Sequence, residues 1–438
     1  MLGLFICVIF LGFPIAFTLM AMGIGFGYYA YFTPGQDFWD NRIFYLFTQN
    51  TFSVMNNDVL ISIPLFLFMG YIIERANILA RLFHSLQVGL RFLPGSMAVA
   101  ALVTCALFAT ATGIVGAVVT LMGLIALPPM LKAGYDQKLS SGVITAGGTL
   151  GILIPPSILL IVYAATASVS VVKLYAAALI PGFLLASLYI LYIAVRCYFR
   201  PEDGPPMPAE DRMVPLRRKL YLLMTSVLPT AVLILSVLGS IFFGIAAVTE
   251  AAAVGALAGM ALAAFYGRMS FGLVKEACIQ TLEITSMILM IAVGAAFFST
   301  VFVALGGDDL IQKLFTSLPM GKWGFILGIN ILLILLGMVI DWIGIVFIMV
   351  PLITPVAESF GFDPVWFAVL VMVNLQISFL TPPFAYSIFY LKGITPPEIK
   401  TTDIYRGVVP FVGLQVLALI LCTLFPGIIT YLPGLMIN

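Results

Sequence analysis

Charged side chains are scarce in this chain. Its 438 residues include 20 Lys and Arg, 19 Asp and Glu and a single His, while 62% of the residues are hydrophobic. This composition cannot cover a buried core with a polar surface, so it excludes a soluble globular protein. We therefore expect an all-α integral membrane protein, in which each span needs about 20 apolar residues.

Reactive side chains are equally few. The cysteines lie singly in apolar surroundings with no CxxC spacing, so neither a disulfide framework nor a zinc site is indicated. They are Cys7, Cys105, Cys197, Cys278 and Cys422. The lone histidine, His84, lies on a basic segment and fits a surface helix better than a proton relay. No nucleophile with its base and no metal cluster is available, which argues against an enzyme. We expect no nucleic-acid partner.

Two long apolar segments are each interrupted by a Pro-Pro pair. They read GTLGILIPPSILLIVYA from Gly148 and QISFLTPPFAYSIFYLKG from Gln376. Proline removes a backbone donor and clashes with the carbonyl one turn earlier, so a regular helix cannot continue there. We predict broken transmembrane helices over 139–170 and 364–391. Such breaks at corresponding places in two halves indicate the midplane binding site of a secondary transporter.

An internal repeat relates the two halves. Adding 227 to the residue number carries Pro128 to Pro355, Gly134 to Gly361, Asp136 to Asp363, the first Pro-Pro pair to the second, and Tyr163 to Tyr390. The stretch ILARLFHSL at 78–86 also reappears as LIQKLFTSL at 310–318. Chance similarity between apolar segments would not preserve Asp, Gly and Pro together. We expect a first repeat at 1–199, a cytoplasmic linker at 200–219 and a second repeat at 220–438.

Hydrophobic runs give the spans. We predict complete crossings at 2–32, 54–73, 139–170, 174–198, 219–242, 246–266, 276–305, 364–391 and 406–432. Two other apolar stretches, 96–131 and 323–357, are too long for one ordinary crossing and have Gly-rich middles. Each fits two full spans or a re-entrant hairpin, and we favour the hairpin. Non-helical backbone at its tip must be covered by protein or a watery cavity.

The basic residues orient the chain in the membrane. With a cytoplasmic N-terminus, 16 of the 20 fall inside, as the positive-inside rule requires. Those outside are Arg42, Lys173, Lys313 and Lys322. The crossings then place the C-terminus in the periplasm. The same topology inverts the repeat, with the first hairpin entering from the cytoplasm and the second from outside.

Three acidic residues fall inside apolar stretches, where ionisable groups are costly and suggest function. Asp341 lies at the second hairpin tip and either tunes the site electrostatically or caps a helix. Glu250 lies among small residues that allow close helix packing, which favours a structural role. Glu283 lies about two turns from Lys275 and is expected near the membrane interface.

Five motifs occur in a fixed order along nearly the whole chain. They are ATATGIVGAVVTLMGLIALPPMLKAGYD, GGTLGILIPPS, LGSIFFGIAAVTEAAAVGALAG, GMVIDWIG and NLQISFLTPP. Together they resemble the large membrane subunit of tripartite ATP-independent periplasmic (TRAP) transporters. The resemblance implies an elevator mechanism within the ion-transporter superfamily and coupled uptake of Na⁺ with an organic acid across a bacterial or archaeal inner membrane. It also implies two partners, a small four-helix membrane subunit and a periplasmic substrate-binding protein.

The resemblance further suggests two sodium sites, built mostly from carbonyl oxygens that the helix breaks release. The first site would consist of Gly116, Leu150, Leu153 and Pro155. The second would consist of Gly337, Ser378, Thr381 and Phe384. One departure concerns the first hairpin tip, where many members carry Ser-Gly-Ser-Ser and this chain has TGIVG at 112–116. The substrate class of better-known members therefore does not carry over.

Neither hairpin offers a cationic clamp for a carboxylate, because no Lys or Arg lies within 92–131 or 323–391. Anion binding must then use half-helix N-termini together with hydroxyls and bound cations. The candidate substrate-binding residues are Thr110, Thr112, Gly113, Thr149, Ser157, Asp341 and Asn374. For each hydroxyl the alternative is a bond back to a carbonyl of its own helix.

An elevator needs a moving core and a static scaffold. We assign the hairpins and broken helices to the core, the matched segments 78–86 and 310–318 to connecting arms, and 2–32, 174–198, 219–266 and the C-terminal span to the scaffold. The main alternative is a standalone anion/Na⁺ symporter of the same superfamily without a binding protein. A small-subunit gene beside this one would favour the tripartite system. A passive channel would not need paired inverted hairpins.

Overall fold

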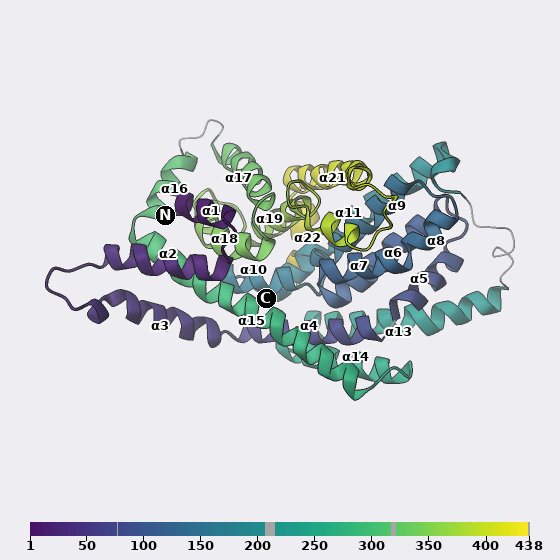
Figure 1. The fold of residues 1–438 in the computed structure, drawn as a ribbon, viewed down its shortest axis with the longest axis horizontal. Coiled ribbons are helices and arrows are strands. Elements are labelled where there is room, and N and C mark those ends of the chain that lie inside the picture. Colours follow the sequence, from purple (N-terminus) through teal and green to yellow (C-terminus); the bar gives the residue numbers. More distant parts are fainter. Residues whose placement is uncertain (77, 206–214, 317–320, 437–438) are drawn as a thin grey trace.

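The computed structural model describes residues 1–76, 78–205, 215–316 and 321–436. Regular structure in these residues is entirely helical, with no strand, which confirms the predicted fold class (Figure 1). The helices form two bodies. One is an elongated layer along the lower part of the view, and the other lies above it and holds both Pro-Pro interruptions.

The first body, which we call the scaffold layer, comprises helices that pack on one another along its length. They are α2 (Ile15–Ala30), α3 (Arg42–Met55), α4 (Asp58–Arg75), α13 (Leu216–Phe242), α14 (Val248–Phe265) and α15 (Phe271–Ala304). The short helices α1 (Leu2–Phe10) and η1 (Phe38–Asp40) accompany its N-terminal part.

The second body, which we call the core bundle, contains both helix pairs predicted as hairpins and both interrupted helices. From the first half it takes α6 (Ser96–Thr112), α7 (Val115–Ile125), α8 (Leu127–Lys132), α9 (Gln137–Thr149), η2 (Leu150–Ile152), α10 (Ile158–Ala167) and α11 (Val171–Phe199). From the second half it takes α17 (Lys322–Gly337), α18 (Trp342–Ser359), α19 (Pro364–Ser378), α20 (Tyr386–Lys392), α21 (Thr401–Leu424) and α22 (Gly427–Leu435).

Two amphipathic helices sit where the predicted arms lie. α5 (Ile78–Gly89) packs against α13 of the scaffold layer and α6 of the core bundle. α16 (Gly307–Thr316) packs against α15, α17 and α18, and the last two residues of the predicted second arm lie outside the described residues. The predicted linker at 200–219 begins with η3 (Pro201–Asp203) and runs into α13, while its middle, 206–214, also lies outside them.

Each proline pair coincides with an interruption. α9 passes into η2, the chain is non-helical at 153–157, and α10 follows. α19 and α20 are likewise separated by the non-helical residues 379–385. The hydrogen-bonded ladder stops because a proline has no N–H to donate to the preceding turn.

The repeat seen in the sequence recurs in the element bounds. Adding 227 to the first residue of α7 or α9 gives the first residue of α18 or α19. Asp136 and Asp363 each accept a hydrogen bond from the backbone N–H three residues further on, at 2.8 and 2.7 Å. Contacts follow the same relation, because α10 packs against α18 while its counterpart α20 packs against α7. The two halves therefore interlock reciprocally.

The predicted spans need three corrections. The run 2–32 is not one helix, because α1 ends at Phe10 and the chain turns through Gly12, with φ of +87°, before Pro14 leads into α2. The crossing at 54–73 is preceded by a helix that was not predicted, α3, which meets α4 at a bend of 54°. Two predicted scaffold spans belong to the core bundle, since α11 and α21 pack against the interrupted helices.

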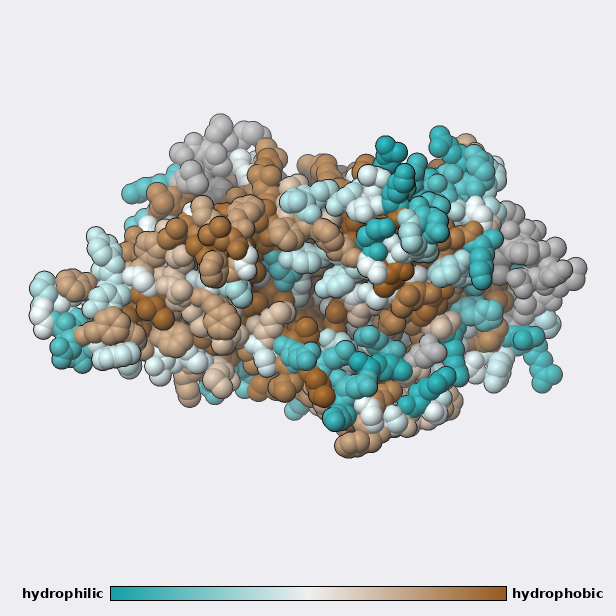
Figure 2. Space-filling view, in the orientation of Figure 1, coloured by the Kyte–Doolittle hydropathy of each residue, from teal (hydrophilic) through white to brown (hydrophobic). Residues whose placement is uncertain are grey.

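Seven helical segments of the described residues are long and apolar enough to cross a membrane, or eight if the bent pair α3–α4 counts as one span. The count differs from the predicted nine partly because an interrupted helix is split into halves too short to span alone. The segments Val115–Lys132 and Trp342–Ser359 are the second limbs of the predicted hairpins, whose re-entry stays a prediction. Figure 2 shows extensive hydrophobic surface on this face, with hydrophilic residues gathered toward the end around α9 and again along the lower edge near α14.

α9 and α21 cross with their backbones in close approach. A methyl group added to Gly142 would lie 2.3 Å from the carbonyl oxygen of Gly407. One added to Gly407 would lie 2.2 Å from the carbonyl oxygen of Lys138. Small residues at both positions thus let the first interrupted helix and the C-terminal span pack tightly.

We expect Gly407→Ala to lower the melting temperature of the purified protein, because the methyl must displace a backbone carbonyl at a cost of about 1–3 kcal/mol. Gly413→Ala on the same helix is the matched control, since nothing lies within 4 Å of its added methyl. Thermal unfolding in detergent measures both. Equal melting temperatures for the two variants would contradict the close crossing.

Candidate functional site

A cavity of about 620 Å³ lies where the core bundle meets the scaffold layer. Its core side is formed by the turn between α6 and α7 (113–116), the start of α18 (341–343) and residues around the second interruption. Its scaffold side is formed by the start of α2 (13–17) and the middle of α15. The tips of both predicted hairpins therefore converge on one space.

Three of the predicted site residues line this cavity, namely Gly113, Gly116 and Asp341. The remaining predicted residues lie behind the lining, within the core bundle, or at its surface in the case of Phe384, which is 43% exposed. Their assignment to substrate or sodium stays a prediction.

The first hairpin tip is held by close contacts on two sides. Gly113 adopts φ of +64°, a left-handed conformation that favours glycine, and a methyl there would lie 3.1 Å from the side chain of Ile158. On the scaffold side, a methyl on Gly70 of α4 would lie 2.7 Å from the Cα atom of Thr112. The tip is thus wedged between α10 and the scaffold layer.

The first tip also meets the second repeat. A methyl on Gly116 would lie 2.6–2.9 Å from ring carbons of Tyr390 on α20, so the ring covers the start of α7 closely. Tyr390 lines the cavity, whereas its repeat counterpart Tyr163 is fully buried. Equivalent residues of the repeat therefore have different environments.

Most of the predicted hydroxyls bond to carbonyls of their own segment. Thr110 donates to Leu107 at 2.8 Å, and Thr149 donates to Ala146 at 2.9 Å. Ser157 donates to the carbonyl of Ile152, across the first interruption, at 2.5 Å. Thr112 differs, because its buried Oγ1 has no hydrogen-bond partner among the described residues. At this tip it is the hydroxyl that still needs a partner.

At the first interruption, one carbonyl oxygen accepts hydrogen bonds from within the same segment. The carbonyl oxygen of Leu150 accepts from the N–H groups of Leu153 and Ile154, at 3.1 and 2.9 Å. Leu150, Leu153 and Pro155 are all buried. Close cover comes from α6, since a methyl on Gly151 would lie 2.0 Å from the Cβ atom of Ala109.

The second interruption brings Ser378 against α17. A methyl on Gly337 would lie 1.9 Å from Ser378 Oγ, and this buried oxygen has no hydrogen-bond partner in the described part of the chain. Thr381 donates to the carbonyl of Ile377 at 3.1 Å. The N–H of Phe384 reaches the carbonyl of Met338 at 3.3 Å. The predicted second sodium set is thus gathered around the end of α17.

Asn374 lies deeper in the core bundle. Its Nδ2 donates to Asn330 of α17, to the side-chain oxygen at 2.8 Å and to the backbone carbonyl at 3.0 Å. Its buried Oδ1 has no partner among the described residues. The predicted polar positions of α19 therefore face α17 rather than the cavity.

The charge of the cavity is set by Asp341, since its described lining contains no Lys, Arg or His. Asp341 stands at the N-cap position of α18, where a negative charge is favourable. Glu250, in contrast, accepts from the N–H of Ala247 at 2.8 Å at the start of α14, as its predicted structural role requires. His84 is exposed on α5.

Sequence reasoning missed most of the lining. The scaffold side comes from α2 and α15, which carry no polar motif to mark them. Pro14 inside the first apolar run could have signalled the break that leads into the cavity. Tyr390 was visible as a repeat position, although nothing in the sequence showed that it would cover Gly116.

An all-helical fold with paired interruptions converging on a cavity defines a membrane transporter. The solved structure of the YdaH transporter from Alcanivorax borkumensis superposes with a TM-score of 0.66 over 94% of this chain and 97% of that one, at 16% sequence identity, and so shares the fold. The family described as "Tripartite ATP-independent periplasmic transporter, DctM component" matches residues 2–428, and this chain belongs to it.

Relatives with assigned names agree with this family. The C4-dicarboxylate TRAP transporter large permease DctM of Pseudomonas aeruginosa is 30% identical over 387 residues, which cover 87% of this chain and 88% of that protein. The protein of the same name from Rhodobacter capsulatus is 29% identical and covers 99% of this chain and 98% of its own length. The sialic acid large permease SiaM of Vibrio cholerae is 25% identical, with 98% and 97% covered. These relatives are transporter permeases rather than enzymes, and the chain is a multi-pass protein of the bacterial inner membrane.

Proposed function

We propose that this large permease imports an organic acid together with Na⁺ by an elevator movement of the core bundle against the scaffold layer. The observation that carries the proposal is the cavity at the boundary of the two bodies, where both hairpin tips meet. Relatives are named for C4-dicarboxylates, isethionate and sialic acid, all of which are organic acids. The N-terminus would be cytoplasmic and the C-terminus periplasmic.

The cavity's charge supports a requirement for Na⁺. An anionic substrate would meet the carboxylate of Asp341 and no fixed cation among the described lining residues. Like charges in a site of low dielectric repel strongly, so an anion needs a bound cation or helix N-terminal N–H groups to be retained. The unpartnered oxygens of Thr112 and Ser378 are available as ligands for a hard ion.

The division into two bodies supports the elevator. Contacts between α4 and the first hairpin tip, and between α15 and α18, cross the boundary that would slide. The arm α5 touches both bodies, as a connecting element must. The corrected core would include α11, α21 and α22 as well as the hairpins and interrupted helices.

Partners follow from the family's tripartite description. A periplasmic binding protein would deliver the substrate, and a small four-helix membrane subunit would stand against the scaffold layer. The isethionate permease DctMQ of Oleidesulfovibrio alaskensis matches this chain over only 60% of its own length, so that protein has a further segment. We propose that this segment corresponds to the small subunit.

The function is tested by uptake into proteoliposomes that contain this chain and its small subunit. A C4-dicarboxylate, isethionate and sialic acid serve as labelled probes, each with and without the binding protein. We expect accumulation of at least one probe only with the binding protein and an inward sodium gradient, and none in choline buffer. Equal accumulation in choline and sodium without a binding protein would refute the proposal. Sodium-driven uptake without the binding protein would instead indicate a standalone symporter.

Ser378→Ala should raise the sodium concentration for half-maximal uptake without lowering protein yield. If the Ser378 oxygen contributes about 1.4 kcal/mol to sodium binding, its loss raises this sodium concentration about tenfold. Ser187→Ala is the control, because that exposed hydroxyl bonds to the carbonyl of Phe183 at 2.7 Å on α11. An unchanged sodium titration with a reduced yield would mean that Ser378 serves packing alone.

A disulfide across the sliding boundary should stop transport. In a chain whose native cysteines are replaced, Gly70→Cys and Thr112→Cys would join α4 to the first hairpin tip, since the Cβ positions are 3.2 Å apart. This is close to disulfide geometry. We expect oxidation to abolish uptake and reduction to restore it.

A second pair provides the matched control within the core bundle. In the same background with Cys105 alone retained, Gly147→Cys would join Cys105, at a Cβ separation of 2.9 Å, and so link α9 to α6. Both helices would move together, so this disulfide should leave uptake intact. Full transport by the Gly70–Thr112 crosslinked protein, with the bond verified by mass spectrometry, would rule out the elevator.

A further inference from the structure

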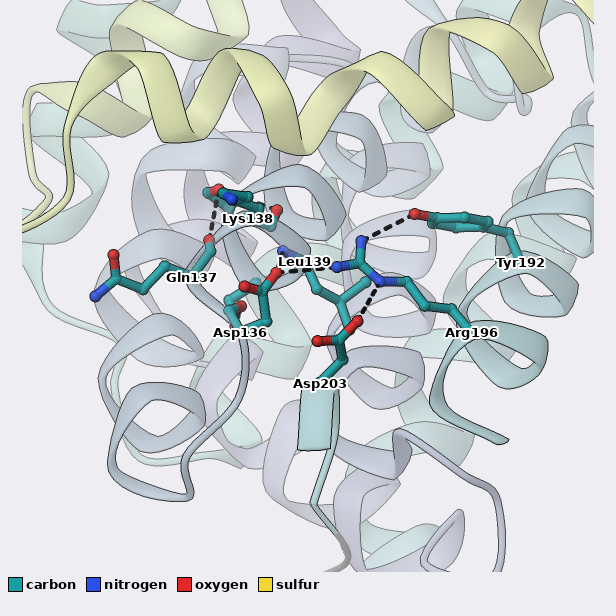
Figure 3. A network of polar contacts seen from close by, with 9 residues as sticks. Asp136, Gln137, Lys138, Leu139, Tyr192, Arg196 and Asp203 are labelled. Atoms are coloured by element: carbon teal, nitrogen blue, oxygen red, sulfur yellow. Dashed lines mark hydrogen bonds and ion pairs between the residues drawn. The ribbon is translucent and has the colours of Figure 1, made fainter. Parts of the chain in front are cut away.

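A network of ion pairs joins three segments of the core bundle, away from the cavity described above (Figure 3). Arg196, in the last turn of α11, donates from Nε to Asp203 at 2.8 Å and from Nη2 to Asp136 at 3.1 Å. Its Nη1 donates to the hydroxyl of Tyr192 at 2.9 Å. Figure 3 shows the guanidinium lying between the two carboxylates.

This network fixes the backbone as well as the side chains. The N–H of Asp136 donates to the carbonyl of Asp203 at 3.0 Å, and Asp136 Oδ1 also accepts from the N–H of Leu139 at the start of α9. Both carboxylates are thereby engaged with Arg196, and that of Asp136 also with the backbone. They do not line the open space next to them.

That space is a basic pocket of about 380 Å³. Among the residues that the structure describes, four cations line it, Lys138, Arg196, Arg200 and Arg406, and no acidic residue does. Among the described residues, only Arg196 of these four forms an ion pair. Counted over the described residues, four positive charges and the two carboxylates that bond Arg196 leave the pocket two uncompensated positive charges. Such a cluster attracts an anion strongly where water is limited.

The pocket lies at the end of a membrane span. α11 and α21 are both long and apolar enough to cross, and Arg196 and Arg406 lie near the C-terminal end of one and the N-terminal end of the other. Val195 and Phe199 also line the pocket, and Leu191 lies one turn further into the span; these three side chains are exposed by 45%, 76% and 59%. Their spacing of four residues places them along one face of α11. A cationic pocket whose apolar lining continues along α11 into the span matches a lipid's phosphate and its acyl chain.

We propose that this pocket binds the phosphate of an anionic phospholipid, with Lys138, Arg200 and Arg406 as its free cations and the α11 face as the acyl track. Basic pockets between helix ends at the membrane surface are suited to such headgroups. The lipid would link the ends of α9, α11 and α21, which Arg196 and the crossing of Gly142 with Gly407 already hold together. The proposal does not depend on sodium coupling or on the elevator.

The test compares lipid retention by native mass spectrometry of delipidated protein titrated with phosphatidylglycerol, phosphatidylcholine or inorganic phosphate. The variant carries Lys138→Gln, Arg200→Gln and Arg406→Gln, and leaves Arg196 in place to preserve the network. The matched control removes three exposed cations elsewhere, with Arg217→Gln, Arg268→Gln and Lys275→Gln. Melting in phosphatidylcholine discs should be equal for all three proteins, which checks the fold.

We expect the wild type and the control to bind phosphatidylglycerol in preference to phosphatidylcholine. The pocket variant should lose about fivefold in affinity for each charge removed. Phosphatidylglycerol discs should raise the melting temperature of the wild type and the control but not that of the variant. Unchanged phosphatidylglycerol binding by the variant would overturn the proposal. Inorganic phosphate binding as tightly as the lipid would also overturn it, because the acyl track would then contribute nothing.

Discussion

Backbone groups that lose their helical partners inside a membrane must find cover, and the two Pro-Pro pairs create this need at two places in the chain. The structure meets it with protein. α6 lies close against the first interruption near Gly151, and the end of α17 meets the second at Ser378. Each hairpin therefore covers the break of its own repeat, while its second limb packs on the other repeat. This arrangement explains why the hairpins and interrupted helices form one body.

The repeat is reciprocal in its contacts but unequal in its surroundings. α10 packs on α18 as α20 packs on α7, yet Tyr163 is buried and Tyr390 lines the cavity. The scaffold layer lies against only one side of the core bundle, so equivalent positions meet different neighbours. The cavity that holds both hairpin tips therefore has a carboxylate from the second half, Asp341, and no equivalent carboxylate from the first half among its described lining residues.

Charge is divided between the interior and the ends of the spans. The cavity's described lining carries a carboxylate and no cation, whereas cations gather where α11 ends and where α9 and α21 begin. Ionisable groups are least costly at the membrane surface, where water and headgroups can reach them. The interior instead relies on hydroxyls, carbonyls and helix ends. The same rule is consistent with the proposed cation-dependent anion site in the core and the proposed lipid-phosphate pocket at the boundary.

The sequence by itself determined the class, the helix breaks, the repeat and most of the order of elements, but not the separation of α1 from α2 or the presence of α3. Composition, proline chemistry and the repeat offset of 227 residues can be read from the sequence alone, because none of them depends on how the helices pack. It also indicated Gly113, Gly116 and Asp341 at the cavity. Only the tertiary structure decided that α11 and α21 join the core bundle, that α2 and α15 close the cavity, and that Ser378 rather than Thr381 keeps a free hydroxyl. A helix that is apolar on every side has no distinct packing face, so its sequence does not show which helices it contacts. These contacts depend on how side chains and backbones fit in three dimensions.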